Sequence, residues 1–235
     1  MRKTVFTTAG KLVDDSIALS FSESAKQNCD DCRLWKACYA SRLERIYKDL
    51  RLKLRRHFRN GGTWVVNRAI AQMGDSPIRW ARMSVDGSLP NRWRFNAREW
   101  SMFVKRLRVL VRAAMERGAK WHVPVESSGK ARSYRVALEG LGVVVRRTSQ
   151  SARFGAVLRQ DDHRAWVVAE RIHKGHVSSA EKKRNVCEAY RLAKVAREAG
   201  VSTVVCGAIA GDTKCGQCTA CAEPLVELIL YPFHP

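Results

Sequence analysis

The sequence predicts an α/β fold, built as an incomplete or irregular βα barrel of the TIM-like kind. Short apolar strands alternate with amphipathic helices along most of the chain, which is typical of a parallel sheet with right-handed crossovers. Polar residues follow several of the strands, at the end where barrels of this kind place their sites. No linker-like stretch divides the 235 residues, so we expect a single domain over 1–235.

In the first half of the chain, the helices are recognised by apolar residues that recur at helical spacing. Such a seam runs through Leu43, Ile46, Leu50 and Leu54, and Asn60-Gly61-Gly62 ends that helix. The elements expected here, in chain order, are strands over 4–8 and 16–20, a helix over 42–59, a strand over 78–85 and a helix over 97–117.

In the second half, short apolar runs predict strands, and capping residues mark the longest helix. Ser178 and Glu181 have the spacing of a capping box, and Gly200 closes that helix. The elements expected here are a strand over 120–125, a short helix over 130–139, strands over 142–146 and 165–169, a helix over 179–198 and a last strand over 202–206.

The chain is strongly basic, with 43 Lys and Arg residues against 22 Asp and Glu residues and a formal net charge of +21. Such an excess favours a polyanionic partner, and nucleic acid, DNA or RNA, is the commonest one. An anionic membrane surface is the alternative, and solubilisation by surface charge is a third. No apolar run approaches the roughly 20 residues of a membrane span, and the N-terminus lacks a signal-peptide core, so we expect a cytoplasmic protein without a membrane partner.

The expected helix over 42–59 is the best candidate for a nucleic-acid contact, because basic residues surround its apolar seam. These residues are Arg42, Arg45, Lys48, Arg51, Lys53, Arg55, Arg56 and Arg59. Tryptophans also alternate with arginines around Trp80 and in Arg92-Trp93-Arg94, a pattern that suits phosphate contact with base stacking. The alternative is a solvated basic face with the tryptophans in the core.

Seven of the eight cysteines fall into two Cys-rich metal-binding segments, 29–40 and 206–221, near the two ends of the expected barrel. The expected ligands are Cys29, Cys32 and Cys38 in the first segment and Cys206, Cys215, Cys218 and Cys221 in the second. Consecutive two-residue spacings, as in 215–221, are more typical of a [4Fe–4S] cluster than of structural zinc, which usually takes separated CxxC pairs. The sequence therefore favours iron–sulfur, with zinc as the alternative.

The number of metal centres stays open between one and two. The first segment offers three thiolates, which leaves a ligand position open to a substrate or cofactor. Alternatively, both segments converge on one centre that joins the two ends of the chain. Cys187 lies on the expected helix over 179–198, next to Val186 and near Tyr190, and we expect it to be a small core residue.

No motif identifies a reaction, and whether the chain is an enzyme is left open. The sequence contains no GxxxxGK[ST], GxGxxG after a strand, HExxH or GxSxG. We expect His122 to be a satisfied interior histidine. Residues at expected strand ends that could together line a central pocket are Asp86, Glu126, Glu170, Arg146, Arg147 and Ser149.

Several segments together resemble the gene product 88-like family carried by phages and plasmids. They are SIALSFS, the Cys-Tyr-Ala that ends the first Cys-rich segment, RMSVDGS, HVPVESS, VVRRTSQS and KCGQCTAC. That family resembles radical S-adenosylmethionine proteins in layout, with a partial βα barrel and an N-terminal Cys cluster. In this chain CxxCx5C stands in place of the radical-enzyme CxxxCxxC.

The resemblance implies the same two ligand sets and an iron–sulfur protein of a mobile genetic element. Combined with the basic surface, this gives an iron–sulfur protein that binds nucleic acid as the leading hypothesis. The alternatives are a radical S-adenosylmethionine-type enzyme, with S-adenosylmethionine as an additional cofactor, and a zinc-bound DNA-binding regulator.

Overall fold

The computed structural model describes residues 6–7, 16–19, 63–83, 89–125, 127–149, 154–158, 163–168, 177–211 and 218–232. The basic helix expected over 42–59 lies outside these residues. So do four of the expected metal ligands, Cys29, Cys32, Cys38 and Cys215.

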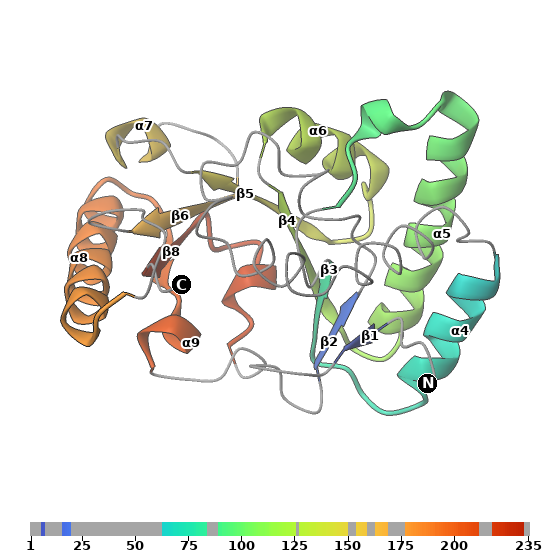
Figure 1. The fold of residues 1–235 in the computed structure, drawn as a ribbon, viewed down its shortest axis with the longest axis horizontal. Helices are drawn as coiled ribbons and strands as arrows, with labels where there is room; N and C mark the ends of the chain where they lie inside the picture. The colour runs from blue at the N-terminus through green and yellow to red at the C-terminus, as the bar shows by residue number, and fades with distance from the viewer. Residues whose placement is uncertain are drawn as a thin grey trace.

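The fold is α/β, with an eight-stranded sheet in the order β1-β2-β3-β4-β5-β6-β8-β7. β1 pairs antiparallel with β2, and every later pairing is parallel. The sheet curls into a half-barrel with helices along its outer side (Figure 1). Its strands are β1 (Phe6–Thr7), β2 (Ser16–Leu19), β3 (Trp80–Met83), β4 (Lys120–Val125), β5 (Val144–Ser149), β6 (Arg164–Val168), β7 (Thr203–Val205) and β8 (Leu228–Pro232).

Helices connect most of the neighbouring strands. They are α4 (Thr63–Met73), η1 (Arg92–Arg94), α5 (Ala97–Met115), α6 (Ser128–Ala137), α7 (Phe154–Leu158), α8 (Ser179–Glu198), α9 (Gly207–Ala210) and η2 (Ala220–Ala222). α8 has the predicted bounds, and the Ser178 side chain accepts a hydrogen bond from the Glu181 backbone N–H. α5 begins with a complete capping box between Asn96 and Glu99, which satisfies two of its free amide groups.

The outer, convex side of the half-barrel holds the apolar core. Side chains of a parallel strand alternate between its two faces, so Trp121, Val123 and Val125 of β4 all point to one side. There they pack with buried residues of α5 such as Leu107 and Leu110. A second cluster joins Trp166 of β6 and residues of β7 and β8 to the alanines of α8, Ala189, Ala193 and Ala196.

The strand predicted over 202–206 is not the last one, which corrects the sequence-based topology. β8 follows it and inserts between β6 and β7, pairing in parallel with both. The connection from β7 to β8 runs through α9 and η2 and packs in a separate apolar cluster with Val204, Ile229 and Tyr231. In Figure 1 this segment lies within the curl of the sheet, on the side opposite α5, α6 and α8. Cys206 and Cys221, at the two ends of the second Cys-rich segment, therefore lie on the concave side of the half-barrel.

Candidate functional site

The concave side of the half-barrel carries polar residues from four different strands. Arg82 of β3, His122 of β4, Arg146 of β5 and Tyr231 of β8 line one pocket there. On β4, His122 alternates with Trp121 and Val123, which belong to the apolar core. The two-residue period of the strands thus separates an apolar outer face from a polar inner one.

Arg146 is the best-connected residue of this inner face. It is 1% exposed, and its guanidinium donates to six backbone carbonyl oxygens at 3.0–3.5 Å. Five of these carbonyls lie in the segment that leads from η2 into β8, namely those of Ala220, Cys221, Glu223, Val226 and Glu227. Burial lowers the pKa of Arg146, and nearby Cys221 and Tyr231 act in the opposite direction.

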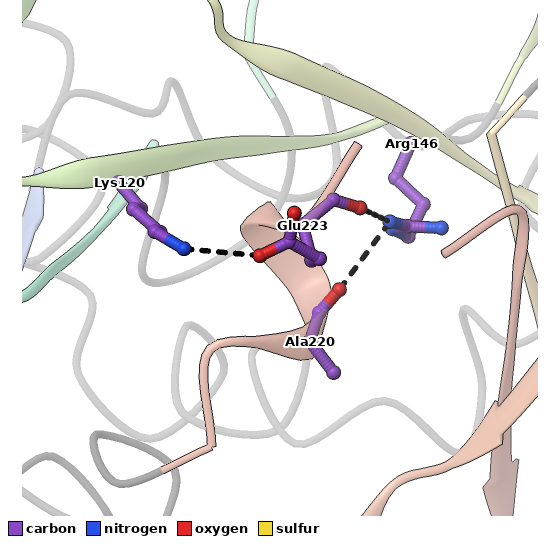
Figure 2. Close-up of polar contacts among 4 residues, drawn as sticks. All are labelled: Lys120, Arg146, Ala220 and Glu223. Atoms are coloured by element: carbon purple, nitrogen blue, oxygen red, sulfur yellow. Dashed lines mark hydrogen bonds and ion pairs between the residues drawn. The ribbon is translucent and has the colours of Figure 1, made fainter. Parts of the chain in front are cut away.

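Figure 2 shows how Glu223 links this arginine to the neighbouring strand. The Glu223 carbonyl oxygen accepts a hydrogen bond from Arg146 Nη2, while its carboxylate forms an ion pair with Lys120 Nζ at 3.0 Å. Glu223 directly follows η2, and Lys120 begins β4. Together these contacts fix the position of the helical turn that carries Cys221.

Two cysteines of the second Cys-rich segment belong to one apolar cluster on the concave side. Cys206 follows β7 as the N-cap of α9, and Cys221 lies on η2. Cys221 Sγ lies 3.1 Å from the Tyr231 hydroxyl oxygen, within hydrogen-bond distance. Burial raises the pKa of Tyr231 well above its ordinary value, and the charges of Cys221 and then Cys206 raise it further.

The described residues supply only part of the expected ligand set. Cys218 is partly buried and described, whereas Cys215 and the first Cys-rich segment lie outside the described residues. Within the part of the chain that the structure describes, no three Cys, His, Asp or Glu side chains are placed to hold a metal ion. Cys187 is exposed on α8, so the expectation of a core residue at this position is wrong.

The pocket beside these cysteines has a volume of about 240 Å³. Its described lining consists of Arg82, His122, Pro124, Arg146, Thr148, Ala165, Ile209 and Tyr231. Tyr231 connects it to the cysteines through its contact with Cys221 Sγ. None of these lining residues carries a carboxylate, whereas two carry a guanidinium. The described lining of the pocket is therefore cationic.

His122 corrects a sequence-based expectation, because it is buried but not satisfied. It is 4% exposed, its ring lies against Trp80 at a centroid distance of 5.0 Å and an interplanar angle of 33°, and Nδ1 has no hydrogen-bond partner among the described residues. Burial, together with the charges of Arg82 and Arg146, lowers the pKa of His122 well below its ordinary value of 6.5. The imidazole is therefore neutral at neutral pH.

The residues predicted to line a central pocket are only partly brought together. Arg146 lines it, but Arg147 points to α6, where its Nη1 donates to Ser128 Oγ at 2.7 Å. Asp86, Glu126 and Glu170, like the side chain of Ser149, lie outside the described residues. The sequence analysis missed Arg82, Thr148 and Tyr231 as lining residues. The alternation of side chains along a strand could have identified Thr148, because it is two residues from Arg146 and therefore faces the same side of the sheet.

The two tryptophans that the sequence places next to arginines differ in their exposure to solvent. Trp80 is buried on the concave side, whereas Trp93 of η1 is 74% exposed. The Arg94 guanidinium carbon lies 5.0 Å from the Trp93 ring centroid, a cation–π distance. An exposed, flat aromatic ring next to a cation is a suitable contact for an unstacked base. This pair belongs to the described part of the basic surface.

Among the described helices, none combines the length and the apolar character needed to cross a lipid bilayer. No protein-family model matches the sequence, and no curated protein matches it either.

Proposed function

We propose that this chain is an iron–sulfur protein that binds nucleic acid through its basic surface. Cys206, Cys215, Cys218 and Cys221 are the proposed ligands of a [4Fe–4S] cluster on the concave side of the half-barrel. The observation that carries the proposal is the meeting of Cys206 and Cys221, which come from separate structural elements, in one apolar cluster beside Tyr231.

The chemistry around these thiols suits such a cluster. Thiolates are the usual ligands of iron–sulfur clusters, and hydrogen bonds to the sulfurs and nearby charges tune the cluster. Tyr231 is in position to donate a hydrogen bond to Cys221 Sγ, and the buried cation of Arg146 offsets thiolate charge. A bound cluster would supply electron transfer or a structural cross-link at this position.

Cys29, Cys32 and Cys38 are proposed to hold a second cluster. Alternatively, the two Cys-rich segments share a single centre, and the surplus thiols are ordinary buried residues. The resemblance of the Cys-rich segments to the phage and plasmid family supports a role in a mobile genetic element. Zinc is the alternative metal for the same thiolates.

Single Cys→Ser variants of the full chain, purified anaerobically, test the metal proposal. Cys206→Ser and Cys221→Ser should each lower the iron content and the visible absorbance of the protein, because each removes a ligand. Cys187→Ser is the matched control, since Cys187 is exposed on α8, and it should keep the wild-type iron content. A colourless wild-type protein that contains stoichiometric zinc would instead establish the zinc alternative.

The nucleic-acid part of the proposal is supported by the net charge of +21 and by the exposed Trp93 beside Arg94. Binding of single-stranded oligonucleotides, followed by fluorescence anisotropy, should weaken steeply with salt, because each neutralised phosphate adds about −0.7 to the log–log slope. Trp93→Ala should weaken binding about tenfold, since one stacked base contributes about 1–3 kcal/mol. The control is Val136→Ala on α6, another exposed apolar residue. Affinity that does not change with salt would refute this part.

A radical S-adenosylmethionine-type enzyme is the second candidate function. It is favoured by the half-barrel, whose inner pocket reaches Cys221 through Tyr231. Anaerobic reduction of the protein with S-adenosylmethionine, followed by a search for 5′-deoxyadenosine, tests it. Failure to detect this product with several reductants would leave the non-enzymatic proposal.

A further inference from the structure

The pocket of the half-barrel contains buried donors and positive charge with no counter-charge among its described lining residues. Arg82 and Arg146 both lie close enough to His122 to lower its pKa. A buried cation is costly unless an anion or several hydrogen bonds compensate it. Arg146 receives its compensation from six backbone carbonyls, whereas Arg82 is partly exposed and its buried Nε makes no hydrogen bond among the described residues.

Two buried nitrogen atoms of the pocket residues lack partners. Arg82 Nε and His122 Nδ1 are both shielded from solvent and make no hydrogen bond within the described part of the chain. Unsatisfied buried polar atoms are uncommon in folded proteins, and each one calls for an explanation such as an unseen ion or ligand. Both atoms belong to residues that line the same pocket, so the polar side chains of this pocket are incompletely paired.

From this arrangement we infer that the pocket binds a small oxyanion, a phosphate or a carboxylate. The Arg82 guanidinium is its main donor, and the His122 imidazole and the Thr148 hydroxyl are further polar contacts. Arg146 contributes its charge rather than a hydrogen bond, because its N–H groups already donate to carbonyl oxygens.

The size of the pocket limits the ligand. A volume of about 240 Å³ lies below the range of about 300–1,000 Å³ that is typical of sites for drug-sized ligands. Pro124, Ala165 and Ile209 supply apolar wall next to the polar groups. The pocket therefore suits inorganic phosphate, a small phosphate ester or a short carboxylic acid, and it does not suit a nucleic-acid strand.

The proposed oxyanion contacts differ from the proposed metal ligands, because no cysteine is among the described lining residues of the pocket. Its test uses the full chain at about 0.15 M salt, where surface charges are screened beyond about 8 Å. Isothermal titration calorimetry with inorganic phosphate and, separately, with acetate distinguishes the two oxyanion classes. We expect one of the two probes to bind with a stoichiometry near one per chain.

Variants then locate the bound probe. Arg82→Gln should weaken binding about tenfold or more, because it removes a charge-assisted donor. Thr148→Val should weaken it several-fold while keeping the shape of the side chain. Lys183→Gln is the matched control, because it removes one positive charge from an exposed position on α8 and should leave the affinity unchanged.

A measurement on the wild-type protein guards against variants that fail to fold. The imidazole resonances of His122, assigned with His122→Gln, should shift on addition of the probe that binds. Binding of neither probe, equal affinity of wild type and a folded Arg82→Gln, or an unchanged His122 signal during binding would each overturn the inference. Equal loss of affinity in Lys183→Gln would do the same, because it would indicate binding by overall charge.

Discussion

The same strands present apolar side chains on the convex face of the half-barrel and mainly polar side chains on the concave face. On the convex face, Trp121, Val123 and Val125 pack against helices in an apolar core. On the concave face, the intervening His122 stacks on Trp80 and leaves Nδ1 without a partner, close to Arg82 and Arg146. The comparison shows that the outer face is stabilised by apolar packing, whereas the inner face carries buried charge, thiols and a pocket and depends on polar contacts.

The largest expected effect comes from removing the buried cation of the concave face. Arg146→Met removes one donor from each of six backbone carbonyls and should lower the free energy of unfolding by about 3–5 kcal/mol. Urea denaturation followed by circular dichroism measures this change. Arg147→Met, at the next position of β5, is the control and should cost about 1 kcal/mol or less. Equal losses in the two variants would show that the carbonyl contacts contribute little.

On the convex face, the corresponding substitution is one that creates a cavity in the apolar core. Leu110→Ala in α5 should cost about 3 kcal/mol, because Leu110 is fully buried in the outer core. The neighbouring Val109 is partly exposed, so Val109→Ala should cost much less. The same denaturation experiment compares them. Leu110→Ala should also keep the wild-type iron content and visible absorbance once folded, since α5 packs on the side opposite the cysteines. Loss of iron from folded Leu110→Ala would show that the apolar core of the convex face and the proposed metal ligands of the concave face are not independent.

Acid should destabilise the concave face through His122. Its pKa is lowered in the folded protein by burial and by Arg82 and Arg146, so below about pH 6.5 the unfolded chain binds a proton that the folded chain does not. Stability should therefore fall with decreasing pH by up to about 1.4 kcal/mol per pH unit from this group.

His122→Phe isolates that contribution, because phenylalanine can keep the stacking on Trp80 but cannot titrate. The free energy of unfolding of wild type and variant is measured by denaturation between pH 8 and pH 5. As pH falls, the difference between the two values should narrow or reverse in favour of the variant. Parallel stability curves would mean that His122 titrates equally in the folded and unfolded chains.

A smaller effect is expected at the start of α5, far from the inner face. Asn96→Ala removes the cap that accepts the Glu99 N–H at 2.9 Å and should cost about 1 kcal/mol. Asn91 precedes η1 without a side-chain capping bond, so Asn91→Ala should be close to neutral. Thermal denaturation compares the two variants. A larger loss in Asn91→Ala would contradict the assignment of the cap.

The sequence predicted the outer face of the half-barrel better than the inner one. Helical periodicity and caps are local signals, and they located α5 and α8 with nearly the observed bounds. The insertion of β8 between β6 and β7 depends on pairing between distant segments, for which the apolar run 228–232 gives no local signal.

The candidate site shows the same division between local and distant signals. Alternation along β4 was sufficient to predict that the His122 side chain is buried. Whether its ring nitrogens find hydrogen-bond partners depends on the side chains of the neighbouring strands β3 and β5. Cys spacing suggested a metal centre, whereas the contact between Cys221 and Tyr231 and the carbonyl contacts of Arg146 required the fold. The exposure of Cys187 and Trp93 was likewise decided by packing rather than by residue type.

The central claim is that thiolates on the concave face hold an iron–sulfur cluster. Its most direct test is the quantification of iron and acid-labile sulfide in full-length protein prepared without oxygen. The account predicts iron and sulfide in equal amounts, about four of each per chain for one cluster and about eight for two. Protein that contains neither and stays folded after treatment with a chelator would contradict it.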